Sequence, residues 1–524
     1  MMQSDNNDSG TLLKKGKKGL HHIIFSRTAV IILLLLIQVL ILFGVFRFLG
    51  QYMVYYFSGG ILLSLVMVFY IMNSRADPTV KLSWLLLVLT APIAGSLLYI
   101  YIKTNFGYRA LQSRIQKIQQ DMAQNQDDSV KLPENLMDTD PVLYRMADYM
   151  EKVGGFSAYS NTDVTYFPFG EAKFEEMLRQ LSKAESFIFM EYFIVEEGHM
   201  WNSILEILKE KAAQGVEVRV MYDGTCAFST LPYSYPKQLK KMGIQCKMFA
   251  PIRPVLSTHY NNRDHRKILV IDGHTAFTGG VNLADEYINR IERFGRWKDT
   301  AVMVRGEAAR GFTSMFLQMW NLTEKMIDNK KYLDAPCSSF DSDGYVIPYG
   351  DNPMDDELFG EMVYLDIINQ AQKYVHIMTP YLILDQQMIT ALTFAAKRGV
   401  DVKLILPHIP DKVYAFALAK SHYKELLDAG VSIYEYTPGF VHAKVFVCDD
   451  YRAVVGTINL DYRSLYHHFE CAVYLHKVSA ISDIEADIQK TLKECKKVDH
   501  ADVKNEKIKM KVLGFVLKLV APLM

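Results

Sequence analysis

A chain of 524 residues exceeds what one hydrophobic core usually organises, so two or more domains are expected. Half of the residues are apolar, and 58 lysines and arginines balance 58 aspartates and glutamates, which leaves a formal net charge of zero. This balance argues against a protein that coats nucleic acid, because such proteins usually carry a basic excess.

Three long apolar runs follow a basic N-terminal tail, residues 1–27. They cover residues 28–46, 48–74 and 82–102, and charged residues bracket the first and the third. Each run is close to or above the roughly 20 residues that a helix needs to cross a bilayer. We therefore predict a membrane anchor of two to three hydrophobic helices over residues 28–102, in a multi-pass protein of the cell membrane. A cleaved signal peptide is disfavoured, because two more runs follow the first.

The side of the membrane that the rest of the chain faces stays open. The tail before the first run and the segment after the third run are both basic. Basic flanks favour the cytoplasmic side, yet three crossings would place these two flanks on opposite sides. One run, such as the one that contains Gly59 and Gly60, could instead be re-entrant or interfacial, so either two or three runs span the bilayer.

The soluble part of the chain contains an internal repeat. After predicted linker helices over residues 103–150, strands alternate with helices from about residue 180. The strand–helix–strand order at residues 187–220 returns at residues 374–404. The segment that begins at Lys211 closely matches the segment that begins at Ala395. The soluble part is therefore a twofold repeat rather than one continuous domain.

The repeat leads to a fold prediction. We expect two similar α/β lobes, residues 151–335 and 336–498, that pair pseudo-symmetrically. Each lobe should contain a mixed, mainly parallel sheet flanked by helices, because strands that alternate with helices favour parallel pairing. A many-unit solenoid is excluded, since the two copies are spaced far beyond the roughly 20 to 50 residues of such repeats.

Each lobe carries the same array of polar residues and glycine. The first array begins at His265 and the second at His442. Counted from each histidine, lysine recurs at +2, aspartate at +7, glycine at +14 and asparagine at +17. These positions are Lys267, Asp272, Gly279 and Asn282 in the first copy, and Lys444, Asp449, Gly456 and Asn459 in the second. Coincidence at five positions inside an independent repeat predicts that the two copies act together in one active site.

The spacing within each array separates two kinds of role. Residues two apart on a strand share a face, so each histidine should project together with its lysine. Asp272 and Asp449 stand at an odd offset and should point the other way. We expect these aspartates to be structural members of the catalytic motif rather than general bases. They would fix the following turn, for which Asp272 and Gly273 form a suitable hairpin pair.

Paired histidines and lysines suit the chemistry of a phosphodiester. The lysines can hold the non-bridging oxygens together with the amides of Asn282 and Asn459, the predicted substrate-binding groups. A neutral histidine can attack phosphorus to form a phosphohistidine, while a protonated histidine on the opposite side donates to the leaving alkoxide. We expect no metal and no cofactor, because neither a carboxylate nor a His/Cys cluster with ligand spacing accompanies the motifs. The six scattered cysteines are interpreted as core residues.

The duplicated motif resembles the signature of the phospholipase D superfamily, and within it the chain is most similar to the bacterial cardiolipin synthases. The narrower resemblance includes short stretches at residues 191–194, 279–282, 297–300, 379–381 and 519–523. It implies two phospholipase D-like lobes and a phosphatidyl transfer between two phosphatidylglycerol molecules that gives cardiolipin and glycerol. It also implies His265 as nucleophile and His442 as acid, whereas the sequence itself is nearly symmetric and does not choose between them.

The resemblance further implies an acidic residue that orients each histidine ring. In the second copy, Glu470 has the position expected behind His442. In the first copy, the residue at the same distance after His265 is Arg293, which is not acidic. We therefore assume a short insertion in this copy and assign the same role to Asp299, behind His265.

The chain ends in a predicted basic amphipathic helix, residues 499–524. Lysines follow one side of it and apolar residues follow another. This pattern suits the surface of an anionic membrane, and a helix that packs on the core is the alternative. The expected partners are phosphatidylglycerol and an anionic phospholipid membrane, and not nucleic acid. The oligomeric state stays open.

Other functions could use the same array. A membrane-bound phospholipase D-type hydrolase or another phosphatidyltransferase would act with a different acceptor, and a nuclease would act on a different substrate. Neutral charge and the lack of an interleaved basic and aromatic strip disfavour the nuclease. Two intact motifs disfavour a non-catalytic membrane scaffold.

Overall fold

The computed structural model describes residues 27–48, 53–103, 106–124, 135–251, 262–324, 329–337, 340, 342–355 and 357–523. The described chain divides into two compact units. One contains the described residues up to Arg109 and after Lys518, and the other contains those between Ala110 and Lys518. The predicted basic tail, residues 1–27, lies outside the described residues except for Arg27.

The first unit is helical. Its helices are α2 (Arg27–Phe48), α3 (Met53–Met72), α4 (Pro78–Thr90) and α5 (Pro92–Lys103), with η5 (Ala521–Leu523) near the C-terminus. A small core forms around Trp84 and Tyr99, whose ring centroids lie 5.1 Å apart, edge to face. Among the described residues, no helix combines the length and the apolar character that crossing a bilayer requires.

The expectation of one continuous helix over residues 82–102 is wrong. Pro92 has no backbone N–H with which to continue α4, and the Ala91 N–H closes that helix on the Leu87 carbonyl at 2.9 Å. The next helix, α5, packs back on α4, and Gly95 permits the contact. A Cβ at Gly95 would lie 2.6 Å from the carbonyl oxygen of Leu87. The third apolar run is therefore a helical hairpin.

Helices also occupy the predicted linker, residues 103–150. They are α6 (Phe106–Gln124), α7 (Leu136–Thr139) and α8 (Pro141–Gly154). Asp140 begins α8 by accepting the Leu143 N–H at 3.1 Å, and Gly155, at φ 69°, ends it. The apolar face of α8 packs into the core of the second lobe, so this part of the linker belongs to the folded unit.

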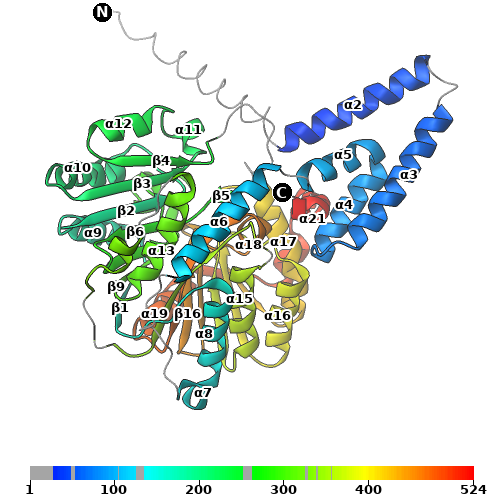
Figure 1. The fold of residues 1–524 in the computed structure, drawn as a ribbon. Helices are drawn as coiled ribbons and strands as arrows, with labels where there is room; N and C mark the ends of the chain where they lie inside the picture. Colours follow the sequence, from blue (N-terminus) through cyan, green and yellow to red (C-terminus); the bar gives the residue numbers. More distant parts are fainter. Residues whose placement is uncertain are drawn as a thin grey trace, which may run out of the picture. The chain divides into compact units, whose positions relative to one another are not determined.

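The first lobe is built on a seven-stranded sheet. Its strand order is β1 (Thr162–Phe167), β9 (Ala301–Gly306), β7 (Thr275–Gly279), β6 (Lys267–Ile271), β2 (Phe187–Tyr192), β3 (Glu217–Asp223) and β4 (Gln245–Phe249). Its helices are α9 (Gly170–Leu181), α10 (His199–Ala213), α11 (Cys226–Ser229), α12 (Tyr235–Lys241), η3 (Asp285–Ile288), α13 (Ala309–Trp320), η4 (Asn321–Thr323) and α14 (Lys330–Leu333). Figure 1 draws this lobe in teal and green, with helices against the sheet.

The second lobe is built on a sheet of the same pattern. Its strand order is β10 (Tyr345–Asp351), β17 (His468–His476), β16 (Arg452–Gly456), β15 (Val445–Cys448), β11 (Tyr374–Met378), β12 (Asp401–Pro407), β13 (Ser432–Tyr436) and β18 (Cys495–Lys497). Its helices are α15 (Phe359–Gln370), α16 (Gln386–Lys397), α17 (Val413–Asp428), α18 (Tyr462–Tyr466) and α19 (Ala480–Leu492). Figure 1 draws this lobe in yellow to red.

The two sheets repeat each other strand for strand. The order β1, β9, β7, β6, β2, β3 and β4 corresponds to β10, β17, β16, β15, β11, β12 and β13. Four short strands lie outside these two series: β5 (Arg263–Asp264), β8 (Arg296–Lys298), β14 (Gly439–Val441) and β18, which extends the second sheet beyond β13. Both lobes belong to the same compact unit. The predicted repeat and the pair of α/β lobes are confirmed.

The sheets are mixed, as expected, but the prediction that they are mainly parallel is wrong. In the first sheet, four of the six neighbouring pairs are antiparallel. The reason is the motif strand itself. After β6 the chain turns at Asp272 and returns directly as β7, without a crossover helix. The second lobe does the same between β15 and β16, at Asp449.

The predicted C-terminal helix, residues 499–524, is interrupted. It consists of α20 (His500–Asn505) and α21 (Ile508–Val520). The apolar side chains expected to face a membrane are exposed, at 78% for Ile508, 56% for Val512, 72% for Phe515 and 52% for Val516. The alternative, a helix that packs on the core through this face, is contradicted. The contact of α21 with α17 is made through Gly514, where a Cβ would lie 2.5 Å from the Ala417 carbonyl oxygen.

Candidate active site

Each motif histidine follows a short strand that pairs with the opposite lobe. The strand before His265, β5, pairs in parallel with β17 of the second lobe. The strand before His442, β14, pairs in parallel with β8 of the first lobe. The backbone N–H of His265 donates to the Phe469 carbonyl at 2.9 Å, and that of His442 donates to the Lys298 carbonyl at 2.7 Å. Both histidines are therefore fixed between the lobes in the same way.

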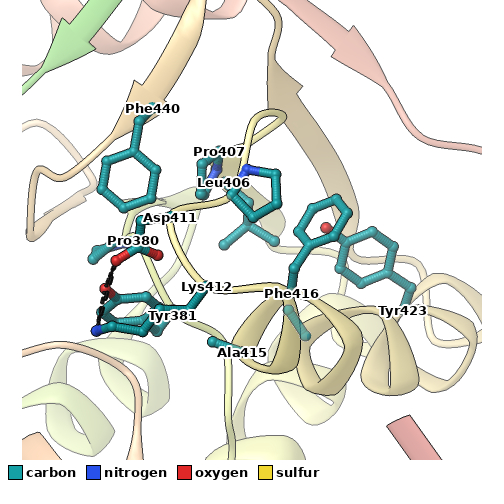
Figure 2. Close-up of a pocket in the computed structure, with 12 residues that line it drawn as sticks. Pro380, Tyr381, Leu406, Pro407, Asp411, Lys412, Ala415, Phe416, Tyr423 and Phe440 are labelled. Atoms are coloured by element: carbon teal, nitrogen blue, oxygen red, sulfur yellow. Dashed lines mark hydrogen bonds and ion pairs between the residues drawn. The ribbon is translucent and has the colours of Figure 1, made fainter. Parts of the chain in front are cut away.

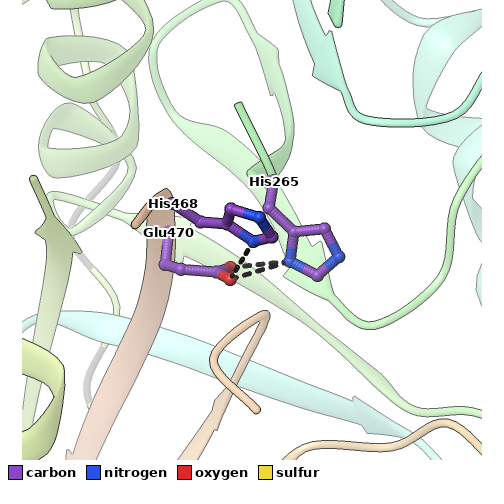
Figure 3. A group of neighbouring side chains, drawn as sticks. All are labelled: His265, His468 and Glu470. Carbon is purple, nitrogen blue, oxygen red and sulfur yellow. Dashed lines mark hydrogen bonds and ion pairs between the residues drawn. The ribbon is translucent and has the colours of Figure 1, made fainter. Parts of the chain in front are cut away.

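The acidic partners are exchanged between the lobes as well. His265 Nδ1 lies 2.8 Å from a carboxylate oxygen of Glu470, which belongs to the second lobe (Figure 3). His442 Nδ1 lies 2.7 Å from Asp299, which belongs to the first lobe. Both acids are fully buried. The prediction that each acid orients the histidine of its own copy is wrong.

A simple geometric reason explains the exchange. Glu470 directly follows Phe469, and Asp299 directly follows Lys298. The carbonyls of Phe469 and Lys298 are the groups that hold the backbone of the opposite lobe's histidine. The next side chain along each strand is therefore placed beside that histidine.

The hydrogen bonds determine which ring nitrogen is available. Glu470 also accepts hydroxyl hydrogen bonds from Ser464, at 2.7 Å, and from Thr457, while Asp299 accepts the Thr300 N–H at 2.9 Å. Because each carboxylate acts as a hydrogen-bond acceptor, from two hydroxyl groups at Glu470 and from one backbone N–H at Asp299, we assign the ring N–H to Nδ1, where it donates to the carboxylate. Each Nε2 then keeps its lone pair.

Burial lowers the pKa of both histidines. The pKa of His442 is about 4, because burial and the charge of Lys444 lower it against the opposing charge of Asp299. The pKa of His265 lies well below its ordinary value, because of burial and then the charge of Lys267. Although burial acts to raise it, the pKa of Asp299 is lowered by the charges of His442 and Lys444. Both imidazoles are therefore neutral at pH 7.

The motif lysines lie buried beside their own histidines, as expected. Lys267 Nζ donates to the backbone oxygen of His265 at 2.5 Å, and Lys444 Nζ donates to that of His442. Burial lowers the pKa of Lys267 to about 8 and that of Lys444 to about 7, and the charge of Lys267 also lowers the pKa of Lys444. An anion bound between the two ammonium groups would reverse these shifts. The arrangement therefore suits a phosphate.

Asn282 and Asn459 are buried, and each donates an amide hydrogen bond inside its own lobe. Asn282 Nδ2 bonds to the Tyr287 hydroxyl at 2.8 Å, and Asn459 Nδ2 bonds to Ser464 Oγ at 2.9 Å. The Tyr287 ring centroid lies 5.4 Å from that of His442. The Ser464 hydroxyl donates to Glu470, the acid beside His265. The two amides thus join the hydrogen-bond networks of the site. Their contact with substrate stays a prediction.

The carboxylates of the motif aspartates bind backbone N–H groups. Asp272 accepts three backbone N–H groups at 2.7–2.8 Å, at the start of β2. Asp449 accepts three at 2.7–2.9 Å, at the start of β11. Both aspartates adopt left-handed backbone conformations, at φ 53° and 52°, in the turns after the motif strands. Each carboxylate ties its turn to the neighbouring strand, which agrees with a structural role.

Glycine lets the backbone approach the His442–Asp299 pair. Gly279 ends β7 at φ 142°, a conformation that L side chains rarely adopt. At the next residue, Gly280, a Cβ would overlap Asp299 Oδ1 and lie 2.9 Å from the His442 carbonyl oxygen. Side chains larger than glycine at Gly279 and Gly280 would therefore clash with the neighbouring backbone and with Asp299.

Sequence reasoning missed two groups of the site. His468, on β17, has its ring centroid 5.4 Å from that of His265 and its Nδ1 3.5 Å from Glu470 (Figure 3). Lys173, on α9, is fully buried, and burial lowers its pKa to about 7 while the charges of Asp299 and Lys267 also reach it. Neither residue belongs to the duplicated array, so the repeat contains no signal for them.

One group near the site has the spacing of a metal-ligand set. Ligand atoms of His265, His468 and Glu470 all lie within 4.8 Å of one another. Among the described residues this is the one such group of three or more histidine, cysteine, aspartate or glutamate side chains. The expectation that the reaction needs no metal stays a prediction. If a metal did take part, these three side chains are where it would bind.

Comparison with protein families gives one match in each lobe. A family model described as the phospholipase D-like domain of cardiolipin synthase matches residues 177–320 and 364–492, which together are about half of the chain. A second model, described as the N-terminal part of phospholipase D-nuclease proteins, matches residues 62–103.

Individual relatives align over most of their lengths. A Streptococcus mutans protein described as uncharacterized is 56% identical over 87% of this chain and 99% of its own length. The cardiolipin synthase of Alkalihalophilus pseudofirmus is 33% identical over 85% of this chain and 89% of its own length. The crystal structure of phosphatidylserine synthase from Haemophilus influenzae superposes with a TM-score of 0.55 at 14% identity, over 72% of this chain and 97% of that one. At this identity the structural likeness supports the fold alone.

Proposed function

The chain belongs to the family of cardiolipin synthases with phospholipase D-like domains, and from this premise we propose that it transfers the phosphatidyl group of one phosphatidylglycerol to a second, giving cardiolipin and glycerol. As a member of this family it is a phosphatidyltransferase. The observation that carries the proposal is the crossed pair of His–acid contacts, which makes one buried site from both lobes.

In the first half of the proposed reaction, His265 Nε2 attacks the phosphorus of the donor lipid. A P–N bond forms as the bond between phosphorus and the glycerol oxygen breaks, and His442 gives its proton to that oxygen. The products are free glycerol and a phosphatidyl group on His265. Attachment of the two histidines to opposite lobes supports their approach from opposite sides of the phosphorus.

The electrostatic difference between the two histidines supports this assignment of roles. Burial, and after it the charge of Lys267, holds the pKa of His265 well below its ordinary value, so His265 stays neutral and nucleophilic. The negative charge of Asp299 favours the protonated form of His442. His442 has to be protonated in order to act as the general acid.

A pKa of about 4 leaves His442 unprotonated at pH 7, so the substrate has to raise it. The phosphodiester carries a negative charge. When it binds between Lys267 and Lys444, it offsets the positive charges that lower the pKa of His442. The acid therefore becomes ready only when the donor lipid is in place.

In the second half, a hydroxyl group of the second phosphatidylglycerol attacks the phosphorus. His442 takes the hydroxyl proton, the new P–O bond forms, and the P–N bond to His265 breaks. Lys267 and Lys444, with the amides of Asn282 and Asn459, hold the non-bridging oxygens as charge develops on them. One glycerol leaves for each cardiolipin formed, and no metal or cofactor enters the scheme.

We also propose that the protein is a multi-pass protein of the cell membrane, anchored through residues 28–102. The apolar runs support this anchor, as does the family match over residues 62–103. The exposed apolar side chains of α21 support a further contact with an anionic phospholipid surface. Each proposed lobe, residues 151–335 and 336–498, contains one phospholipase D-like match.

The test uses purified protein in vesicles of phosphatidylglycerol, without nucleotide. We expect cardiolipin and glycerol in equal amounts, and no product from the His265→Ala variant. Phosphatidic acid with glycerol, and no cardiolipin, would identify a hydrolase instead. A protein that releases no glycerol at all would contradict both functions.

A further inference from the structure

The contact between His442 and Asp299 is carried by a very small sheet. The strand before His442, β14, and the strand before Asp299, β8, pair over three residues. A two-stranded ladder of this length is not stable on its own, so each strand needs support from the rest of the molecule. The distance between His442 and Asp299 therefore depends on what holds these two strands relative to each other.

Close packing in the second lobe supports β14. Its central residue, Phe440, is 1% exposed and lines a small hollow together with Leu406, Pro407 and Phe416 (Figure 2). The hollow measures about 10 Å³, which is room for no more than about one water molecule. The strand that carries His442 therefore has little space in which to move.

A buried ion pair connects β8 to the second lobe. The ammonium group of Lys298 donates to both carboxylate oxygens of Asp487 at 2.7 Å, and to the Pro168 carbonyl at 2.6 Å. Asp487 lies on α19 of the second lobe and also accepts the Tyr166 hydroxyl at 2.7 Å. The side chains of Lys298 and Asp487 are 1% and 6% exposed. Three acceptors thus satisfy the three hydrogens of the ammonium group and fix its position.

Lys298 joins this ion pair to the groups that hold His442. Its carbonyl accepts the His442 backbone N–H at 2.7 Å, and the next residue, Asp299, lies 2.7 Å from His442 Nδ1. A shift of Lys298 would therefore displace both groups. The corresponding residue beside His265 is Phe469, which has no charge with which to form such an ion pair. The two halves of the site differ in this support.

Stability alone does not explain a buried ion pair. The cost of removing two charges from water roughly cancels their attraction, and apolar side chains of similar volume often give a protein of equal stability. An ion pair in which one ammonium group reaches both carboxylate oxygens is directional, however, and it favours one relative position of the two elements that it joins. Here those elements are β8 of the first lobe and α19 of the second.

We propose that Asp487 is a positioning residue for the general acid of the reaction. Through Lys298, it holds the segment that carries Asp299 against the second lobe, so that the Asp299 carboxylate stays within hydrogen-bond distance of His442. Asp487 acts through Asp299 and takes no part in making or breaking bonds. The inference rests on the proposed function, in which His442 protonates the glycerol oxygen that leaves the donor lipid.

The first test compares two leaving groups. With phosphatidylglycerol, we expect Asp487→Asn to lower the rate of glycerol release by about 10- to 100-fold, because a displaced Asp299 no longer favours protonated His442. The burst of p-nitrophenol from a phosphatidyl ester of p-nitrophenol should stay within about twofold, since this leaving group needs no proton. A general loss of structure would lower both rates. Asp483→Asn, at an exposed position of the same helix, is the matched control and should change neither.

The second test asks whether Asp487 acts through Asp299. With radiolabelled phosphatidylglycerol, Asp487→Asn added to the Asp299→Asn variant should lower glycerol release by less than about threefold, against at least about tenfold in the wild-type background. The two effects should not multiply, because Asp299→Asn has already removed the group that Asp487 positions. Effects that do multiply would overturn the proposal.

The third test separates position from stability. Asp487→Asn leaves the charge of Lys298 buried without its counterion, which can prevent folding. A triple variant with Tyr166→Phe, Lys298→Met and Asp487→Leu replaces the network with apolar side chains, and its melting temperature should stay near that of the wild type. We expect the same slow glycerol release and the same retained burst of p-nitrophenol. A folded triple variant that releases glycerol at the wild-type rate would show that the ion pair is only structural.

These measurements do not depend on the acceptor. A wild-type protein that forms phosphatidic acid and no cardiolipin would overturn the proposed transfer alone, since a hydrolase also releases glycerol and the role of Asp487 would still be measured. An equal fall of glycerol release and of the p-nitrophenol burst in folded variants would overturn the positioning role alone.

Discussion

The two lobes share a strand order, but they surround the two histidines differently. The His265 ring lies beside His468, and two hydroxyl groups donate to its acid, Glu470. The His442 ring lies among the aromatic rings of Tyr287, Trp297 and Phe440, with centroids 5.4, 5.5 and 5.9 Å away. The His265 side therefore combines these polar groups with one aromatic ring, Phe193, whose centroid lies 4.9 Å away, whereas three aromatic rings surround His442. The strands that both lobes share fix the positions of the two histidines. The side chains around each histidine differ between the lobes, and this difference distinguishes the nucleophile from the acid.

Replacing either motif histidine should give the largest effect. With phosphatidylglycerol, we expect His265→Ala and His442→Ala each to lower cardiolipin formation by at least about 10⁴-fold, because both residues act in both half-reactions. A phosphatidyl ester of p-nitrophenol separates the two, since this leaving group needs no proton. His442→Ala should still give a single-turnover burst of p-nitrophenol, and His265→Ala should not. Bursts from both variants would contradict the assigned roles; His500→Ala, at an exposed histidine, is the control.

Replacing the acids should give the next largest effect, and each replacement should impair the histidine of the opposite lobe. Glu470→Gln and Asp299→Asn should each lower turnover by about 10²–10⁴-fold, because each ring loses the partner that holds its tautomer. The p-nitrophenyl ester should largely rescue Asp299→Asn, whose defect lies in the acid His442. It should not rescue Glu470→Gln. Rescue of Glu470→Gln and not of Asp299→Asn would instead favour pairing of each acid with the histidine of its own lobe.

Stability should depend on pH through His442. Its pKa is about 4 in the folded protein and 6.5 in the unfolded chain, so between these values the unfolded chain binds a proton that the native state does not. The contribution is complete above pH 6.5, and the free energy of unfolding should fall by up to about 3 kcal/mol as the pH drops to 4. His442→Asn should flatten this dependence. Melting temperatures of both proteins across pH 4–7 check it, and parallel curves would contradict a lowered pKa.

The motif aspartates should affect stability more than chemistry. Asp272→Asn and Asp449→Asn weaken hydrogen bonds to three backbone N–H groups each, and we expect a loss of about 2 kcal/mol in the free energy of unfolding. Turnover per folded molecule should stay within a few-fold of the wild type. Asp483→Asn, at an exposed position of α19, is the control. A stable but inactive Asp272→Asn variant would show that this residue acts in the chemistry.

A chelator should give the smallest effect. Because the proposed reaction uses imidazoles and lysines alone, excess EDTA should change cardiolipin formation by less than about twofold. Loss of activity that Zn²⁺ restores would assign a metal to His265, His468 and Glu470. His468→Asn, which removes one ligand of that set, should weaken such a restoration.

Much of this comparison could be predicted from the sequence. The offsets of lysine, aspartate, glycine and asparagine from each histidine identified the two motif strands and the residues that meet in one site. The odd offset of Asp272 and Asp449 indicated their structural role, because alternation along a strand is a local property. Local periodicity and internal repetition do not require knowledge of distant contacts.

The exchange of the acids could not be predicted in this way. The distance along the chain from His442 to Glu470 does not say which lobe's histidine faces that side chain; the pairing of β5 with β17 decides it. The antiparallel majority was missed because the hairpins after the motif strands lack a crossover helix. His468 and Lys173 occur outside the array, so the repeat carries no signal for them.

The most direct measurement is the position of the covalent phosphatidyl group. The protein is mixed with phosphatidylglycerol, quenched at neutral to basic pH within one turnover, and digested for mass spectrometry. We expect the group on His265, with its yield lowered by Glu470→Gln and maintained in Asp299→Asn when the p-nitrophenyl ester is the donor. A group on His442, or a yield that depends on Asp299 and not on Glu470, would contradict a site built from histidines and acids of opposite lobes.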